Sequence, residues 1–200
     1  MLNRAWPGFL LLTMIKFIIG KKLGMHQIFR ENKAIPVTIV EAGPCWVVRK
    51  KEEDKDGYQA IQVGFQKKGE KYRYLREFRV DPEGYKIGQE IKADVFQAGD
   101  QVKAQSMSKG KGFQGAVKRW GFSGQNASHG GKGDVRKLGS IGSGFPQRVR
   151  RGRKMPGQMG YYQTTVRNLD IVEVDPEHNL LIIKGPLPGV NGALVKIESL

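Results

Sequence analysis

Apolar and polar residues alternate with a period of two over much of the first half of the chain. The alternation is clearest over 35–40 and 60–65, where β-branched residues are frequent. A two-residue period places successive side chains on opposite faces of an extended strand, so these runs predict half-buried β-strands. A charged run over 50–57, which ends in Asp56 and Gly57, predicts the hairpin loop between two strands.

The same β pattern returns toward the C-terminus, with Gly and Pro turn signals between the runs. Further strand-like runs are 100–106, 164–174, 180–184 and 193–197. Short strands at this spacing predict a mainly β fold, a small closed β-barrel assembled from 14–106 plus 164–200. Residues 67–98 predict a minor α/β insertion on it, and the basic run 67–79 within them predicts a loop or a short helix.

The period-two pattern is absent between 107 and 165. Fourteen of the 27 glycines of the chain lie there. A structureless stretch of this length is uncommon inside a compact domain unless it is functional or disordered. The sequence therefore predicts a long, irregular, glycine-rich basic extension over 107–163.

Positive charge is concentrated in the same region. The 200-residue chain carries a formal net charge of +15, and residues 101–169 hold 14 basic residues with Asp134 as their only acid. Such a segment predicts a polyanionic partner, nucleic acid before an anionic membrane. The glycines exclude the long amphipathic helix that a membrane surface would require, because each costs roughly 1 kcal/mol relative to alanine. We expect the segment to be disordered alone and ordered by a polyanion.

Glycine beside Lys and Arg suits phosphate binding. Glycine lets the backbone approach a phosphate, and its exposed N–H groups can donate to phosphate oxygens. Lys and Arg neutralise charge, and Arg can also stack on a base. Aromatic residues such as Phe113, Trp120 and Phe145 are interspersed, and flat rings can stack on unpaired bases.

No catalytic, cofactor or metal site is predicted. Cys45 is the only cysteine, which excludes an intramolecular disulfide, and the three histidines show no ligand spacing. Residues 110–115 match G-x-G-x-x-G, but no strand–turn–helix unit surrounds them, so a dinucleotide site is not supported. Two function classes stay open at this point: an RNA-binding structural protein, and an RNA-modifying enzyme or translation-factor-like RNA-binding module.

Residues 1–13 allow two interpretations. They are an upstream extension or the product of a mis-set start, with Met14 as the natural first residue, or they belong to a targeting segment. The apolar run between Phe9 and Ile15 is far shorter than the ~20 residues that span a bilayer. We favour the first interpretation, because no small-residue cleavage site follows the run.

Several motifs occur together and in order along the chain. They include Gly20–Met25 (GKKLGM), Glu41–Cys45 (EAGPC), Ser108–Gly115 (SKGKGFQG), Gly139–Gly142 (GSIG), Gly152–Gly160 (GRKMPGQMG) and Val174–Glu177 (VDPE). Through these motifs the chain, from Met14 to about Ile197, resembles bacterial large-subunit ribosomal proteins of the universal L-three family.

The resemblance implies a globular β-barrel on the outside of the large ribosomal subunit, and an extension that threads through rRNA toward the peptidyl-transferase region. It implies a structural protein of the cytoplasmic ribosome, which binds large-subunit rRNA early and nucleates assembly. The expected protein neighbours are the ribosomal proteins L-fourteen and L-nineteen. No small-molecule substrate, cofactor or membrane is implied.

The resemblance also assigns candidate rRNA contacts. These are Lys109, Lys111, Lys118, Arg119, Trp120, His129, Lys132, Arg136, Lys137, Arg148, Arg150, Arg151, Arg153, Lys154 and Arg167. Two positions depart from a simple transfer. Trp120 stands where many members of the family carry His, and Gln147 lies in a variable tip where some members carry a methylated glutamine that we do not assign here.

Overall fold

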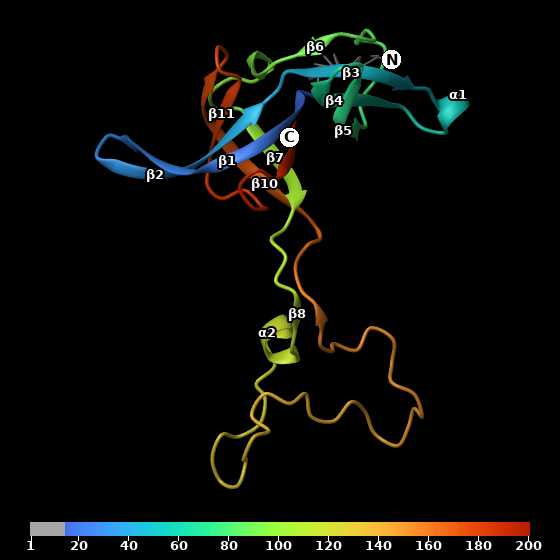
Figure 1. The fold of residues 1–200 in the computed structure, drawn as a ribbon, viewed down its shortest axis with the longest axis vertical. Helices are drawn as coiled ribbons and strands as arrows, with labels where there is room; N and C mark the ends of the chain where they lie inside the picture. Colours follow the sequence, from blue (N-terminus) through green and yellow to red (C-terminus); the bar gives the residue numbers. More distant parts are fainter. Residues whose placement is uncertain (1–14) are drawn as a thin grey trace, which may run out of the picture. The chain divides into compact units, whose positions relative to one another are not determined.

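The structure is a computed structural model that describes residues 15–200, so the expected extension over 1–13 and the start at Met14 lie outside the described residues. Two compact units make up the described chain. We call residues 15–106 with 164–200 the β unit, and residues 107–163 the basic unit (Figure 1).

Six strands of the β unit form a ring of pairings in the order β1-β12-β7-β10-β11-β2, in which β2 pairs with β1. Their bounds are β1 Phe17–Arg30, β2 Lys33–Ala42, β7 Gln101–Met107, β10 Gln163–Asp175, β11 Leu180–Lys184 and β12 Leu194–Ser199. These strands include all the runs that alternate in the sequence near 35–40 and toward the C-terminus. The prediction of a mainly β fold is confirmed.

A second, four-stranded sheet has the order β5-β4-β3-β6. Its strands are β3 Cys45–Lys51, β4 Ala60–Lys68, β5 Lys71–Phe78 and β6 Glu90–Ile91. The short helix α1 (Glu53–Asp56) occupies the predicted loop between β3 and β4, and the 3₁₀ turn η1 (Ala93–Val95) follows β6.

The prediction of a loop or short helix over 67–79 is wrong, because this run contains strand β5. Over residues 71–74 the strand alternates cations with aromatic residues, and the aromatic rings supply its packing. The ring of Tyr72 covers Gly64, and the ring of Tyr74 stacks on Phe65 with their centroids 6.4 Å apart. The high charge of the run concealed this period-two pattern.

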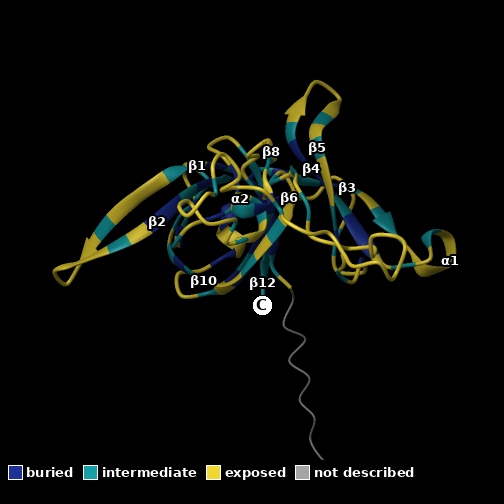
Figure 2. Cartoon of the chain, turned by 90° about the horizontal axis from the view of Figure 1, so that it is seen from below, coloured by how far each residue is buried: buried dark blue, intermediate teal, exposed yellow. Residues whose placement is uncertain are grey.

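One hydrophobic core serves the ring and the four-stranded sheet. Its members include Ile19 and Ile197 from the ring and Phe65 and Phe78 from the sheet. Phe17 of β1 stacks on Phe78 of β5, with ring centroids 4.4 Å apart. Figure 2 shows the buried residues gathered in the strands, while α1 and the outer part of the β1–β2 hairpin are exposed.

Cys45 is part of this core, as expected for a structural thiol. Its side chain is fully buried, and its Sγ donates to the carbonyl oxygen of Ile19 at 3.3 Å. Burial raises the pKa of the Cys45 thiol to about 12, because a thiolate would lose its hydration there. The thiol is therefore protonated at neutral pH, which makes it a poor nucleophile.

The basic unit contains three short elements: β8 (Phe113–Gln114), α2 (Ala116–Trp120) and β9 (Gly157–Gln158). β8 pairs with β9. We call the part of the unit before residue 122 the outgoing arm and the part after residue 153 the returning arm. Three further backbone hydrogen bonds of 2.9 Å join these arms: the N–H groups of Ser108, Lys111 and Met159 donate to the carbonyl oxygens of Tyr162, Met159 and Gly112, in that order. The irregular segment predicted from the sequence thus includes a short folded portion.

No helix within residues 15–200 is long and apolar enough to cross a membrane.

Candidate nucleic-acid interface

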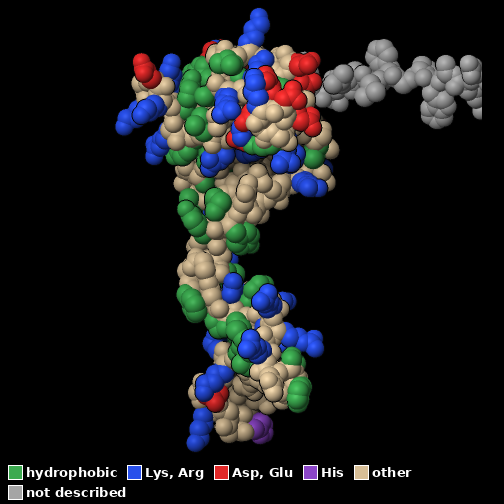
Figure 3. All heavy atoms as spheres, turned by 90° about the vertical axis from the view of Figure 1, so that its right-hand side faces the viewer, with side chains coloured by type: hydrophobic (Ala, Val, Ile, Leu, Met, Phe, Trp, Pro, Cys, Tyr) green, Lys and Arg blue, Asp and Glu red, His purple; other side chains and the backbone are tan. Residues whose placement is uncertain are grey.

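The basic unit carries most of the excess positive charge. It holds 12 Lys and Arg residues and one acid, Asp134, for a net charge of +11. Figure 3 shows blue Lys and Arg side chains along its surface and hardly any red. All the sequence-predicted contacts in this unit are exposed except Arg119, which is half-buried. A single-sign surface of this kind can neutralise a row of phosphates.

Three of the predicted contacts, Arg119, Trp120 and Lys154, come together although they lie on different arms. The guanidinium carbon of Arg119 lies 4.9 Å from the centroid of the Trp120 ring, and the Lys154 Nζ lies 5.5 Å from it. Trp120 Nε1 and an Arg119 guanidinium nitrogen both donate to the Met155 carbonyl oxygen, at 2.9 and 2.8 Å.

Helix α2 places these side chains. Gly121 follows Trp120 in the left-handed region, with φ of 73°, and its N–H donates to the Val117 carbonyl oxygen at 2.9 Å. Glycine adopts this conformation without a Cβ clash, so it ends the helix directly after Trp120. The short helix thereby directs two neighbouring side chains, Arg119 and Trp120, at the arm that returns.

The Lys and Arg side chains of the loop beyond α2 are exposed to solvent. Arg153 donates to the Ser140 carbonyl oxygen at 2.9 Å, and Lys137 forms an ion pair with Asp134 at 2.7 Å. The other predicted contacts of this loop, which have no side-chain partner among the described residues, are His129, Lys132, Arg136, Arg148, Arg150 and Arg151. These side chains remain available to phosphates or bases.

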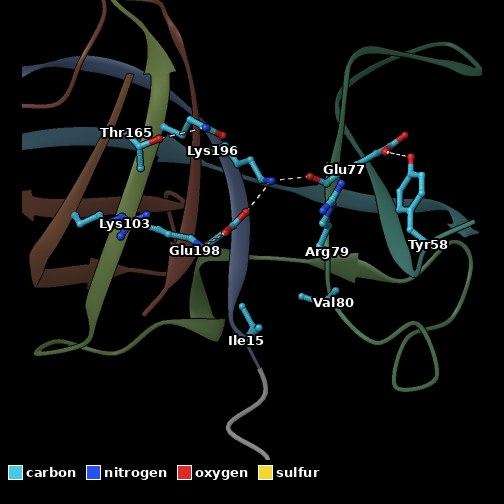
Figure 4. A pocket seen from close by; sticks show the side chains of 11 residues that line it. Ile15, Tyr58, Glu77, Arg79, Val80, Lys103, Thr165, Lys196 and Glu198 are labelled. Carbon is cyan, nitrogen blue, oxygen red and sulfur yellow. Dashed lines mark hydrogen bonds and ion pairs between the residues drawn. The ribbon is translucent and has the colours of Figure 1, made fainter. Parts of the chain in front are cut away.

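The remaining predicted contact, Arg167, belongs to strand β10 of the β unit and not to the basic unit. It lines a pocket of about 440 Å³ together with Arg79, Lys103 and Lys196, which the sequence did not single out (Figure 4). These residues come from strands distant in the sequence, so no local motif could reveal them.

Two carboxylates balance part of the charge in this pocket. Glu198 pairs with Lys103 at 2.6 Å and with Lys196 at 2.7 Å. Burial by itself would raise the pKa of Glu198, but the hydrogen bonds from Lys103 and Lys196 outweigh it and lower the pKa. Hydrogen bonds from Lys51 and Tyr58 likewise lower the pKa of Glu77. Both acids are thus ionised at neutral pH, while Arg79 and Arg167 form no ion pair with any described residue.

Within residues 15–200 no group of three or more His, Cys, Asp or Glu side chains could hold a metal ion. The described chemistry consists of exposed Lys and Arg side chains, backbone N–H groups and aromatic rings. These groups suit contacts with phosphates and unpaired bases.

Comparison with known proteins gives the family. Residues 83–184 match the family described as Ribosomal protein L3. The chain is 48% identical over 202 residues to the large ribosomal subunit protein uL3 of Thermosipho africanus, covering 92% of this chain and 98% of the relative. The protein of the same name from Thermotoga maritima is also 48% identical, over 92% of this chain and 97% of the relative. Identity to the Carboxydothermus hydrogenoformans protein is 48% over 204 residues, with 92% and 97% covered. Motifs, charge and similarity agree, and the chain belongs to the ribosomal protein L3 family.

Proposed function

We propose that this protein is a structural constituent of the large ribosomal subunit, and that it binds large-subunit rRNA mainly through the basic unit. The relatives described above are named as large ribosomal subunit proteins. Membership of the family indicates a ribosomal protein and not an enzyme, so an RNA-modifying activity is not favoured. The observation that carries the rRNA-binding proposal is the presence of 12 cations and one acid in a unit that has almost no core of its own.

The proposal assigns the rRNA contacts to the exposed cations of this unit. The cations of the loop beyond α2, among them Arg148, Arg150 and Arg151, have the fewest protein partners and are thus the freest to neutralise phosphates. Arg167 adds a contact from the β unit. The family resemblance supports a path for this unit toward the peptidyl-transferase region and an early role in assembly.

We also propose the finer architecture. The ring of six strands is a small closed β-barrel; each strand in it has two hydrogen-bonded neighbours, and β2 returns to β1. The functional domains are the barrel with its insertion (14–106 and 164–200) and the rRNA-binding extension (107–163), which agree with the two compact units. By resemblance, L-fourteen and L-nineteen are the protein neighbours, in the cytoplasmic ribosome.

Sucrose-gradient sedimentation of a tagged copy produced in bacterial cells tests this proposal. We expect the tagged chain in the large-subunit fractions and, in extracts of growing cells, in assembly intermediates. A polycationic peptide of matched net charge is the control for non-specific adhesion. Recovery of the tagged chain only among free proteins at the top of the gradient would overturn the proposal.

A further inference from the structure

The basic unit contains a folded clasp, which we define as Arg119, Trp120, Lys154, Met155 and Gly157. Arg119 and Trp120 end helix α2 on the outgoing arm, and the other three residues lie on the returning arm. The two hydrogen bonds to the Met155 carbonyl oxygen and the Lys154 ammonium over the indole ring join the arms at this place. Everything between 122 and 153 is therefore a loop whose two ends are held together.

The environment of Trp120 differs from that of two other aromatic residues in this unit, Phe145 and Tyr161. Its indole N–H is bonded to protein, two cations lie over its ring, and 42% of the residue is exposed. Phe145 and Tyr161 are 82% and 71% exposed, and no ring contact involves them among the described residues. A base can stack on Phe145 without disturbing the protein, but stacking on Trp120 would compete with the clasp.

We propose that Trp120 is a positioning residue, which closes the loop over 122–153 before rRNA is bound, rather than a platform on which a base stacks. The inference rests on the proposed rRNA-binding function and deepens it. A loop with joined ends has fewer conformations than two free arms, so its cations lose less entropy when they bind. The Trp120 ring thereby adds affinity without itself contacting RNA.

Gly157 offers a way to open the clasp without changing any charge or aromatic ring. A Cβ on Gly157 would lie 2.6 Å from a guanidinium nitrogen of Arg119, so Gly157→Ala displaces the guanidinium from the Met155 carbonyl. Gly115 provides the matched control. It lies in the same unit with φ of −67°, and a Cβ there meets no atom within 4 Å.

The first measurement needs no RNA. In the full chain with Trp6→Phe and Trp46→Phe, Trp120 is the only fluorescent indole. We expect Gly157→Ala to shift its emission toward that of a solvated indole, and Gly115→Ala to leave the emission unchanged. An emission that is the same in all three proteins, and the same as in the urea-unfolded chain, would overturn the clasp.

The second measurement is the affinity for a large-subunit rRNA fragment at several salt concentrations. We expect Gly157→Ala and Trp120→Ala each to weaken binding by about tenfold at every salt concentration, with an unchanged slope of log affinity against log salt. A stacking role predicts a different result: Trp120→Ala weakens binding, while Gly157→Ala, which retains the indole, binds like the parent chain. That result, or a slope reduced in Gly157→Ala, would overturn the proposal. If the parent chain itself does not bind the RNA, the proposed function fails, and the fluorescence measurement still decides whether the clasp exists.

Discussion

The β unit and the basic unit are each stabilised by different interactions. The β unit has 21 basic and 18 acidic residues, and its large aromatic and aliphatic side chains form one core. The basic unit has 12 basic residues and one acid, and Ala116 is its only buried hydrophobic residue. Apolar burial can stabilise the first unit by itself. The second gains little from burial, so its cations must gain their stabilisation from a polyanion.

The largest effect is expected from a deletion that removes most of the basic unit and leaves the β unit. Deleting 109–160 leaves β7 and β10 as hydrogen-bonded neighbours, so the β unit has its strand pairings intact. We expect a cooperative thermal transition in the deletion variant, and an affinity for large-subunit rRNA lower by about 10³-fold or more at 50 mM salt, because most phosphate contacts are gone.

Incorporation into large subunits provides the matching test in cells. We expect the deletion variant to be missing from mature subunits while the full chain is present. Normal incorporation of the deletion variant would show that the basic unit is dispensable, and would contradict the division of roles proposed here.

The second prediction concerns the core of the β unit. Phe65 is 1% exposed, so Phe65→Ala leaves a cavity and should lower the free energy of unfolding by about 3–5 kcal/mol. Phe113 of the basic unit, which is 75% exposed, is the matched control. Phe113→Ala should change the free energy of unfolding by less than about 0.5 kcal/mol. Chemical denaturation measures both; equal effects of the two substitutions would remove the contrast between the units.

The third prediction concerns Glu198, one of the two ionised carboxylates in the pocket of the β unit. Because the folded-state pKa of Glu198 lies below its usual value of 4.5, its charge stabilises the fold above that pH, and the contribution is lost as the pH falls through the folded-state pKa. Glu198→Gln should therefore cost about 1–2 kcal/mol at pH 7, since Lys103 and Lys196 lose their acceptor.

The difference between Glu198→Gln and the parent chain should shrink as the pH falls below 4.5, which denaturation curves at pH 3 to 7 would measure. Glu83→Gln, at an exposed position of the same unit, is the control. A destabilisation by Glu198→Gln that does not change with pH would mean that packing, not charge, explains the loss.

The smallest effect is expected for one exposed cation of the basic unit. Arg151→Gln should reduce the slope of log affinity against log salt by about 1 and leave the unfolding transition unchanged. Lys55→Gln in α1 of the β unit removes the same charge at a position that we assign no RNA contact, and should leave the slope unchanged. Identical slopes for these two variants would contradict the assignment of Arg151.

The sequence could predict the strands that alternate cleanly, because a period of two requires only local information. It could also predict the polyanion-binding character of the basic unit, since charge is additive along the chain. Strand β5 was missed, because its first half alternates Lys and Arg with Tyr, and its second half does not alternate cleanly. The clasp was missed because its members lie on two arms, more than thirty residues apart, that the β8–β9 pairing and three further backbone hydrogen bonds bring together.

The pocket around Arg167 illustrates the same limit. Arg79, Lys103 and Lys196 lie near it only because β7, β10 and β12 are brought together by the ring and β5 is packed against it. Each of these cations, seen in its own segment, looks like an ordinary solvated residue. Long-range strand pairing, and not residue type, brings these cations to the same pocket.

The most direct test of the central claim, that the charge of the basic unit carries rRNA binding, is the salt dependence of the affinity of the full chain for large-subunit rRNA. If about ten phosphates are neutralised, the affinity should fall by about 10³–10⁵-fold between 50 and 200 mM salt. An affinity that stays nearly constant over this range would contradict the claim.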